Sequence, residues 1–92
     1  MDVLTDEQVT ERLDGLPGWT QDRNSIVHVQ KLADFKAALL YVGAVAYLAE
    51  EANHHPDVLI QWNKVTLTLS THSAGGLTAN DFALADQINR LG

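Results

Sequence analysis

Residues 64–72, KVTLTLSTH, alternate apolar and polar side chains closely and decide how the rest of the chain is interpreted. Val65, Leu67 and Leu69 share one face of this segment, and Thr66, Thr68 and Ser70 share the other. A period of two is typical of an antiparallel strand buried on one face only. The preceding residues 58–62, VLIQW, form a second strand, joined to the first at Asn63–Lys64. If the pleat continues, His72 lies on the threonine side, away from the packed face.

The segments on either side of this hairpin predict three helices and a second hairpin. Thr5 caps a helix from about Asp6 to Leu13, with Gln8 completing a capping box. A hairpin follows over residues 19–30, with the turn DRN. Asp34 caps a long helix over 35–53, and Thr78 caps a last one, roughly 79–91, in which Leu84, Ile88 and Leu91 face inward. The order α-β-β-α-β-β-α predicts a single α+β domain over residues 1–92. Its four-stranded antiparallel sheet is covered by three helices on one face.

The long helix is apolar nearly all round. One stripe at helical spacing comprises Phe35, Leu39, Val42, Ala46 and Ala49. The other side carries Leu40, Tyr41, Ala44, Tyr47 and Leu48. Such a helix must be covered on more than one side, and a chain of 92 residues can hardly do so alone. We therefore expect a homodimer or homotetramer assembled through residues 37–49. This uncharged run is shorter than the roughly 20 residues of a membrane span, so no membrane association is expected.

Composition indicates which binding partners and which cellular location to expect. Six basic residues are scattered among twelve acidic ones, and the formal net charge of −6 argues against binding to nucleic acid. The chain has no cysteine, which fits a reducing compartment. Its acidic beginning, MDVLTDEQ, lacks the basic and apolar regions of a signal peptide. We expect a cytoplasmic protein.

Three of the four histidines are predicted to converge. His54 and His55 lie in the loop after the long helix, and the hairpin returns His72 toward the same loop. With Glu50 or Asp81 they could form a zinc site. Against this, adjacent loop histidines tend to point in different directions, and H-x-x-x-H spacing is absent. Acid–base chemistry fits better, because imidazole exchanges protons near neutrality, and neighbouring imidazoles resist being charged together.

Simpler interpretations exist for these residues. Loop histidines are more often surface residues than catalysts, and Asp81 could merely complete a capping box with Thr78. Trp19 and Trp62 could both be core residues. His28 alternates with valines in its strand and is expected to be exposed, with no role.

The spaced set of Glu50, the HHP run at 54–56, Trp62, the LSTH run at 69–72 and Asp81 resembles the pterin-4a-carbinolamine dehydratases. These are also described as dimerisation cofactors of a homeodomain transcription factor. Gly18–Trp19, Asp34–Phe35 and Asn63–Val65 add to the resemblance, which covers nearly the whole chain. It implies a hydro-lyase that converts 4a-hydroxytetrahydropterin to quinonoid dihydropterin in tetrahydropterin recycling, with no cofactor and no metal. It also implies the fold derived above and assembly into dimers and tetramers.

The resemblance further implies roles for individual residues. His54 and His72 transfer protons, and His55 binds the pterin with a secondary acid–base role. Asp81 and Glu50 hold or charge-tune histidines. The remaining pterin contacts come from Trp19, Pro56, Ser70 and Thr71. The alternative is a non-enzymatic module that binds or assembles proteins through the long helix, against which the intact catalytic set argues.

Overall fold

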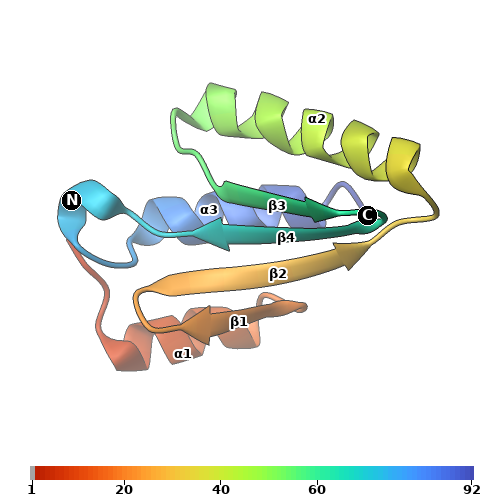
Figure 1. Ribbon diagram of the computed structural model, residues 1–92. Helices are drawn as coiled ribbons and strands as arrows, with labels where there is room; N and C mark the ends of the chain where they lie inside the picture. Colours follow the sequence, from red (N-terminus) through yellow and green to blue (C-terminus); the bar gives the residue numbers. More distant parts are fainter. Residues whose placement is uncertain (1) are drawn as a thin grey trace.

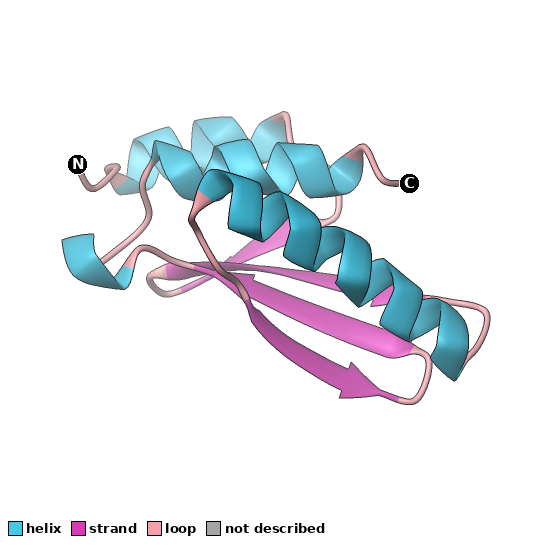
Figure 2. Ribbon diagram, turned by 90° about the horizontal axis from the view of Figure 1, so that it is seen from above, coloured by secondary structure: helices cyan, strands magenta, loops and turns pink. Residues whose placement is uncertain are grey.

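The computed structural model describes residues 2–92 and shows one antiparallel sheet with its helices on one side. The elements in chain order are α1 (Asp6–Asp14), β1 (Trp19–Asp22), β2 (Ser25–Lys31), α2 (Phe35–Ala52), β3 (Asp57–Gln61), β4 (Lys64–Leu69) and α3 (Ala79–Asn89). A single 3-10 turn, η1 (His72–Ala74), precedes α3. The four strands pair in the order β1-β2-β4-β3 (Figure 1), and the helices cover one face of the sheet (Figure 2). The predicted fold class and element order are confirmed.

Strand β4 lies inside the sheet and supplies the centre of the core. Its partners are β2 on one side, where Leu69 pairs with Ile26, and β3 on the other, where Leu67 pairs with Val58. Val65, Leu67 and Leu69 are fully buried under the helices, whereas the threonines between them are half-buried on the open face. The period-two prediction is therefore confirmed. Its extension to His72 is wrong, because the strand ends at Leu69 and the chain turns into η1.

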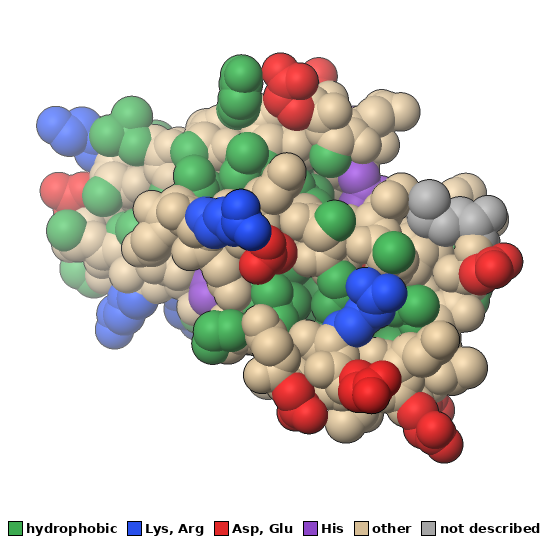
Figure 3. All heavy atoms as spheres, turned by 180° about the vertical axis from the view of Figure 1, so that it is seen from behind, with side chains coloured by type: hydrophobic (Ala, Val, Ile, Leu, Met, Phe, Trp, Pro, Cys, Tyr) green, Lys and Arg blue, Asp and Glu red, His purple; other side chains and the backbone are tan. Residues whose placement is uncertain are grey.

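Helix α2 buries one face against the sheet and leaves several of its bulky residues exposed on the other. The buried residues on its inner face are Ala38, Val45 and Ala49. Three members of the apolar stripe, Phe35, Leu39 and Ala46, are exposed, so most of this stripe does not face the sheet. Leu40 and Tyr47 are 69% and 67% exposed, and Figure 3 shows hydrophobic side chains along this edge of the molecule. No helix within residues 2–92 is long and apolar enough to cross a membrane.

Tyr41 places a polar group, its hydroxyl, in the interior beside α2. Its hydroxyl is buried and has no hydrogen-bond partner among residues 2–92. Because burial disfavours the charged phenolate, it raises the pKa of Tyr41. The hydroxyl therefore stays protonated at neutral pH.

The β1–β2 hairpin differs from its prediction at one residue. His28 is half-buried on the helix-facing side, so the expectation of an exposed histidine is wrong. It stacks on Trp19 with 5.2 Å between ring centroids, and Nδ1 lies 2.8 Å from the carbonyl oxygen of Gly18. Trp19 is a core residue, 5% exposed, and its indole Nε1 donates to Asn89 Oδ1 at 2.9 Å. These contacts fasten β1 to β2 and to the end of α3.

Leu91, which was expected to face inward, and Trp62, for which a core position was one interpretation, both lie outside the core. Trp62 is 68% exposed in the turn between β3 and β4, where its φ of 53° places it in the left-handed region. Leu91 is exposed because α3 ends at Asn89. Both residues lie in or beyond chain reversals, which sequence periodicity does not describe.

Candidate active site

The three predicted histidines meet at one cleft of about 290 Å³. His54 and His55 follow the end of α2, and His72 begins η1 after β4. The residues that line the cleft are Asn53, His54, His55, Ser70, Thr71, His72 and Ser73. Strands β3 and β4 are antiparallel, so the end of β4 lies beside the loop that begins β3. The convergence expected from the hairpin is present in the structure.

The end of α2 fixes the backbone on which His54 stands. Asn53 adopts a left-handed conformation with φ 49° and ψ 44°. The amide of His54 donates to the carbonyl of Ala49 at 3.0 Å, and the amide of Asn53 donates to that of Glu50 at 3.2 Å. This pair of bonds is a Schellman motif, in which a left-handed residue ends the helix and satisfies its last carbonyls. It holds His54 at a defined place beside the cleft.

Asp81 holds the side chain of His54 from the protein interior. Its side chain is 0% exposed, and Oδ1 lies 2.5 Å from Nε2 of His54. Oδ2 accepts hydrogen bonds from the Thr71 hydroxyl at 2.8 Å and from the Thr78 amide at 2.9 Å. A buried carboxylate requires such partners, and the N-terminus of α3 favours its negative charge. A carboxylate accepts only, so Nε2 of His54 carries the proton and Nδ1 is left for chemistry.

His55 forms a second, solvent-exposed pair. Its Nε2 lies 2.5 Å from Oε2 of Glu50, and both side chains are more than half exposed. Solvent weakens an exposed contact of this kind, so it orients His55 more than it stabilises the fold. Glu50 and Pro56 do not line the cleft. They line an adjoining apolar groove of about 250 Å³, together with Val42, Val45, Ala46, Ala49, His55 and Val58. His55 is shared between the groove and the cleft.

The remaining predicted contacts separate into two groups. Ser70 and Thr71 line the cleft, although the buried hydroxyl of Thr71 is engaged by Asp81. Trp19 does not reach the cleft, because it lies on the edge strand β1, with β2 and β4 between it and β3. Sequence reasoning missed Asn53 and Ser73. Asn53 had a detectable signal, since asparagine tolerates the left-handed conformation that ends helices; Ser73 had none.

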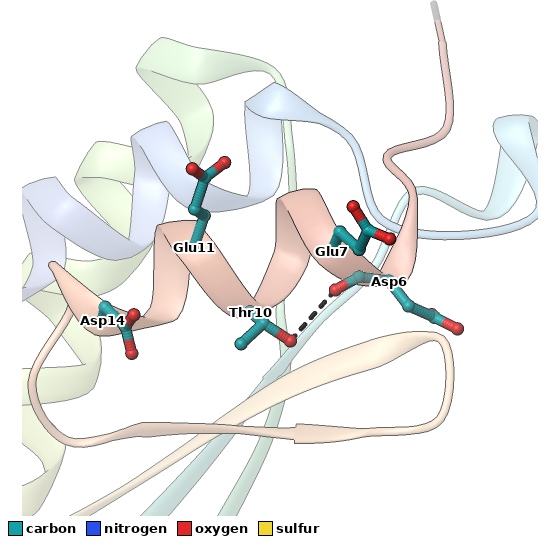
Figure 4. Close-up of a pocket in the computed structure, with 5 residues that line it drawn as sticks. All are labelled: Asp6, Glu7, Thr10, Glu11 and Asp14. Atoms are coloured by element: carbon teal, nitrogen blue, oxygen red, sulfur yellow. Dashed lines mark hydrogen bonds between the residues drawn. The ribbon is translucent and has the colours of Figure 1, made fainter.

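The rest of the described chain offers neither a metal site nor a second cluster of residues suited to acid–base chemistry. No group of three or more metal-ligating side chains within residues 2–92 is arranged to hold a metal ion. A shallow hollow over α1 is lined by Asp6, Glu7, Thr10, Glu11 and Asp14 (Figure 4). The only hydrogen bond drawn among them joins the Thr10 hydroxyl to the carbonyl of Asp6. These carboxylates lie along one exposed helix, away from the histidines.

Comparison with known proteins places the chain in a family. Residues 2–91 match the family model described as pterin 4 alpha carbinolamine dehydratase. A candidate pterin-4-alpha-carbinolamine dehydratase from Roseiflexus castenholzii is 52% identical over 97% of this chain and 96% of its own. Another from Chloroflexus aurantiacus is 47% identical over 99% of this chain and 98% of its own.

Solved structures agree with the sequence matches. The crystal structure of a transcriptional coactivator/pterin dehydratase from Brucella melitensis superposes with a TM-score of 0.93, at 33% identity and 98% coverage of both chains. A pterin dehydratase-like protein identified as a RuBisCO assembly factor of the alpha-carboxysome shares the fold, with a TM-score of 0.67 and 21% identity. It covers 80% of this chain and 88% of its own.

Fold and cleft together define a small α+β domain with a cleft lined by histidines. The chain belongs to the pterin-4a-carbinolamine dehydratase family, whose enzyme class is that of the hydro-lyases.

The left-handed Asn53 generates a stability prediction. Asn53→Ala should lower the free energy of unfolding by about 1 kcal/mol, because alanine lacks the local side-chain hydrogen bonding that helps asparagine adopt the left-handed region. Asn53→Gly should stay within about 0.5 kcal/mol of the wild type, since glycine adopts that region freely. Urea denaturation measures both. Equal stabilities for the alanine and glycine variants would contradict the conformation assigned to residue 53.

Proposed function

We propose that the protein dehydrates 4a-hydroxytetrahydropterin to quinonoid dihydropterin by histidine acid–base catalysis, as a step in tetrahydropterin recycling. The observation that carries the proposal is the meeting of three imidazoles at one cleft, with His54 anchored by a buried carboxylate. Family membership supplies the substrate class. A cytoplasmic location stays a prediction.

The reaction requires one proton to be delivered and another to be removed. A proton transferred to the C4a hydroxyl lets the C–O bond break, and the hydroxyl leaves as water. The N5 lone pair forms the C4a=N5 double bond as the hydroxyl departs. A proton lost from a ring nitrogen then gives the neutral quinonoid product, so the net change is the loss of one water. Histidine serves both transfers, because either protonation state is accessible near neutrality.

The contacts suggest which histidine does what. His54 is the base in this proposal, because Asp81 holds its Nε2–H and stabilises the imidazolium that forms when Nδ1 accepts a proton. His72 is exposed at the cleft and draws its proton from solvent, which suits the acid that protonates the leaving hydroxyl. His55, oriented by Glu50, and Ser70 contact the pterin. No step in this scheme needs a metal ion.

Substitution of the histidines tests the assignment. His54→Ala and His72→Ala should each reduce kcat/KM for dehydration by about 100-fold or more, the usual contribution of a positioned acid or base. The loss of enzymatically generated 4a-hydroxytetrahydropterin is followed with and without protein, in the presence of a chelator. His28→Asn is the matched control, because His28 lies outside the cleft. Dehydration that survives in the double variant His54→Ala/His72→Ala would defeat the assignment, and a requirement for added metal would defeat the metal-free scheme.

The outer surface of α2 supports the proposal that the chain forms a homodimer or homotetramer through residues 37–49. Exposed leucines and a tyrosine lie along this helix: Leu39, Leu40 and Tyr47, beside the exposed Gly43. Surfaces of this kind mark protein–protein contacts. The same surface is the basis of the alternative function, in which the chain serves as a protein-binding or assembly module.

A charge on this surface should dissociate the oligomer. Leu40→Glu removes the burial of a leucine, worth about 1.5–3 kcal/mol per side chain, and places a carboxylate in the contact. Sedimentation velocity should then shift toward the mass of one chain. Leu91→Glu is the control, since Leu91 is an exposed leucine beyond α3. A wild-type protein that sediments as one chain, or an unchanged Leu40→Glu variant, would contradict the proposed contact.

A further inference from the structure

Two threonine hydroxyls lie behind the histidine cleft and connect to Asp81. Thr71 Oγ1 lies 2.8 Å from Thr78 Oγ1 and 2.8 Å from Asp81 Oδ2. The amide of Thr78 reaches the same carboxylate oxygen at 2.9 Å. All three residues are buried, with Thr78 and Asp81 fully inaccessible to solvent. The structure confirms that Thr78 and Asp81 form the capping box of α3. Neither this cap nor the acid–base scheme requires the buried hydroxyl of Thr71, which therefore calls for a separate explanation.

Counting protons fixes the direction of every bond in this group. A threonine hydroxyl has one proton, and a carboxylate has none to give. Thr71 must therefore donate to Asp81, and Thr78 must donate to Thr71, since the Thr71 proton is already used. The order is Thr78 hydroxyl to Thr71 hydroxyl to Asp81 Oδ2. The carboxylate is left with Oδ1 turned to His54.

Thr71 is also connected to His72 through its backbone. Its carbonyl accepts from the amides of Ala74 and Gly75, both at 3.0 Å, and its amide donates to the carbonyl of Gly76 at 3.0 Å. These bonds form the base of η1, which begins with His72. One residue thus fixes the turn that carries His72 and, through Asp81, the ring of His54.

We propose that Thr71 and Thr78 are positioning residues for the dehydration. Their hydroxyls form a chain of hydrogen bonds from Thr78 to Thr71 to Asp81, called the relay below, and this chain orients the Asp81 carboxylate toward His54. The inference rests on the proposed function. It also changes the role expected for Thr71, whose hydroxyl orients Asp81 and does not bind the pterin. The chemistry needs this support because a base displaced by about 1 Å can lose about 100-fold in rate.

The test compares Thr71→Val with Thr71→Ser. Valine keeps the shape of threonine and removes the hydroxyl, whereas serine keeps the hydroxyl and removes the methyl group. Thr71→Val should lower kcat by about 10- to 100-fold with KM within about 2-fold of the wild type. Thr71→Ser should recover most of that loss. Thr78→Val and Thr78→Ser form a second pair that should behave alike, and they decide the matter if Thr71→Val does not fold.

A second readout is independent of activity. The ring nitrogens of His54, observed by ¹⁵N NMR, should shift in Thr71→Val and return to their wild-type positions in Thr71→Ser. A raised KM with unchanged kcat would show that Thr71 binds the substrate and would overturn the relay. Equal loss in the serine and valine variants would overturn it too, because packing would then be the cause. Absence of dehydration in the wild type would instead refute the proposed function, and the NMR comparison would still decide whether the relay orients His54.

Discussion

The buried carboxylate of Asp81 is the constraint on which the site depends. It joins the N-terminus of α3, which carries it, to the nearby segment after β4 and to the loop after α2, which lies 27 residues away in sequence. A buried charge is tolerated only when its oxygens are paired, so the three segments must come together for the fold to form without penalty. The requirement that stabilises the domain also places His54 beside His72. Stability and site geometry are thus consequences of the same set of bonds.

The strand pairing and the end of α2 bring the segments around Asp81 together. The antiparallel pairing of β3 with β4 brings the end of one strand beside the beginning of the other, and the Schellman motif ends α2 at the same point. The apolar groove between α2 and β3 then meets the cleft at His55. The groove along α2 and the histidine cleft are therefore adjacent parts of one molecule, and the helix proposed for assembly also borders the proposed catalytic site.

The sequence predicted features that depend on local pattern and missed those that depend on packing. The period of two in β4, the caps at Thr5 and Asp34 and the chain reversal at Pro56 were sufficient for the fold class, because each has a local physical cause. The buried face of α2 could not be predicted, since a helix apolar on all sides carries no signal for which side faces the sheet. His28 was misjudged because its burial comes from stacking on Trp19 across the hairpin. The meeting of the histidines followed from hairpin topology, whereas the threonine contacts of Asp81 required coordinates.

The tautomer of His54 tests the central claim most directly, and ¹⁵N-detected NMR of the wild-type protein at a pH where the ring is neutral measures it. The account predicts a proton on Nε2, donated to Asp81, and an unprotonated Nδ1 available to the cleft. A neutral ring protonated on Nδ1 would mean that Asp81 donates to His54, and the geometry described for the base would then be contradicted.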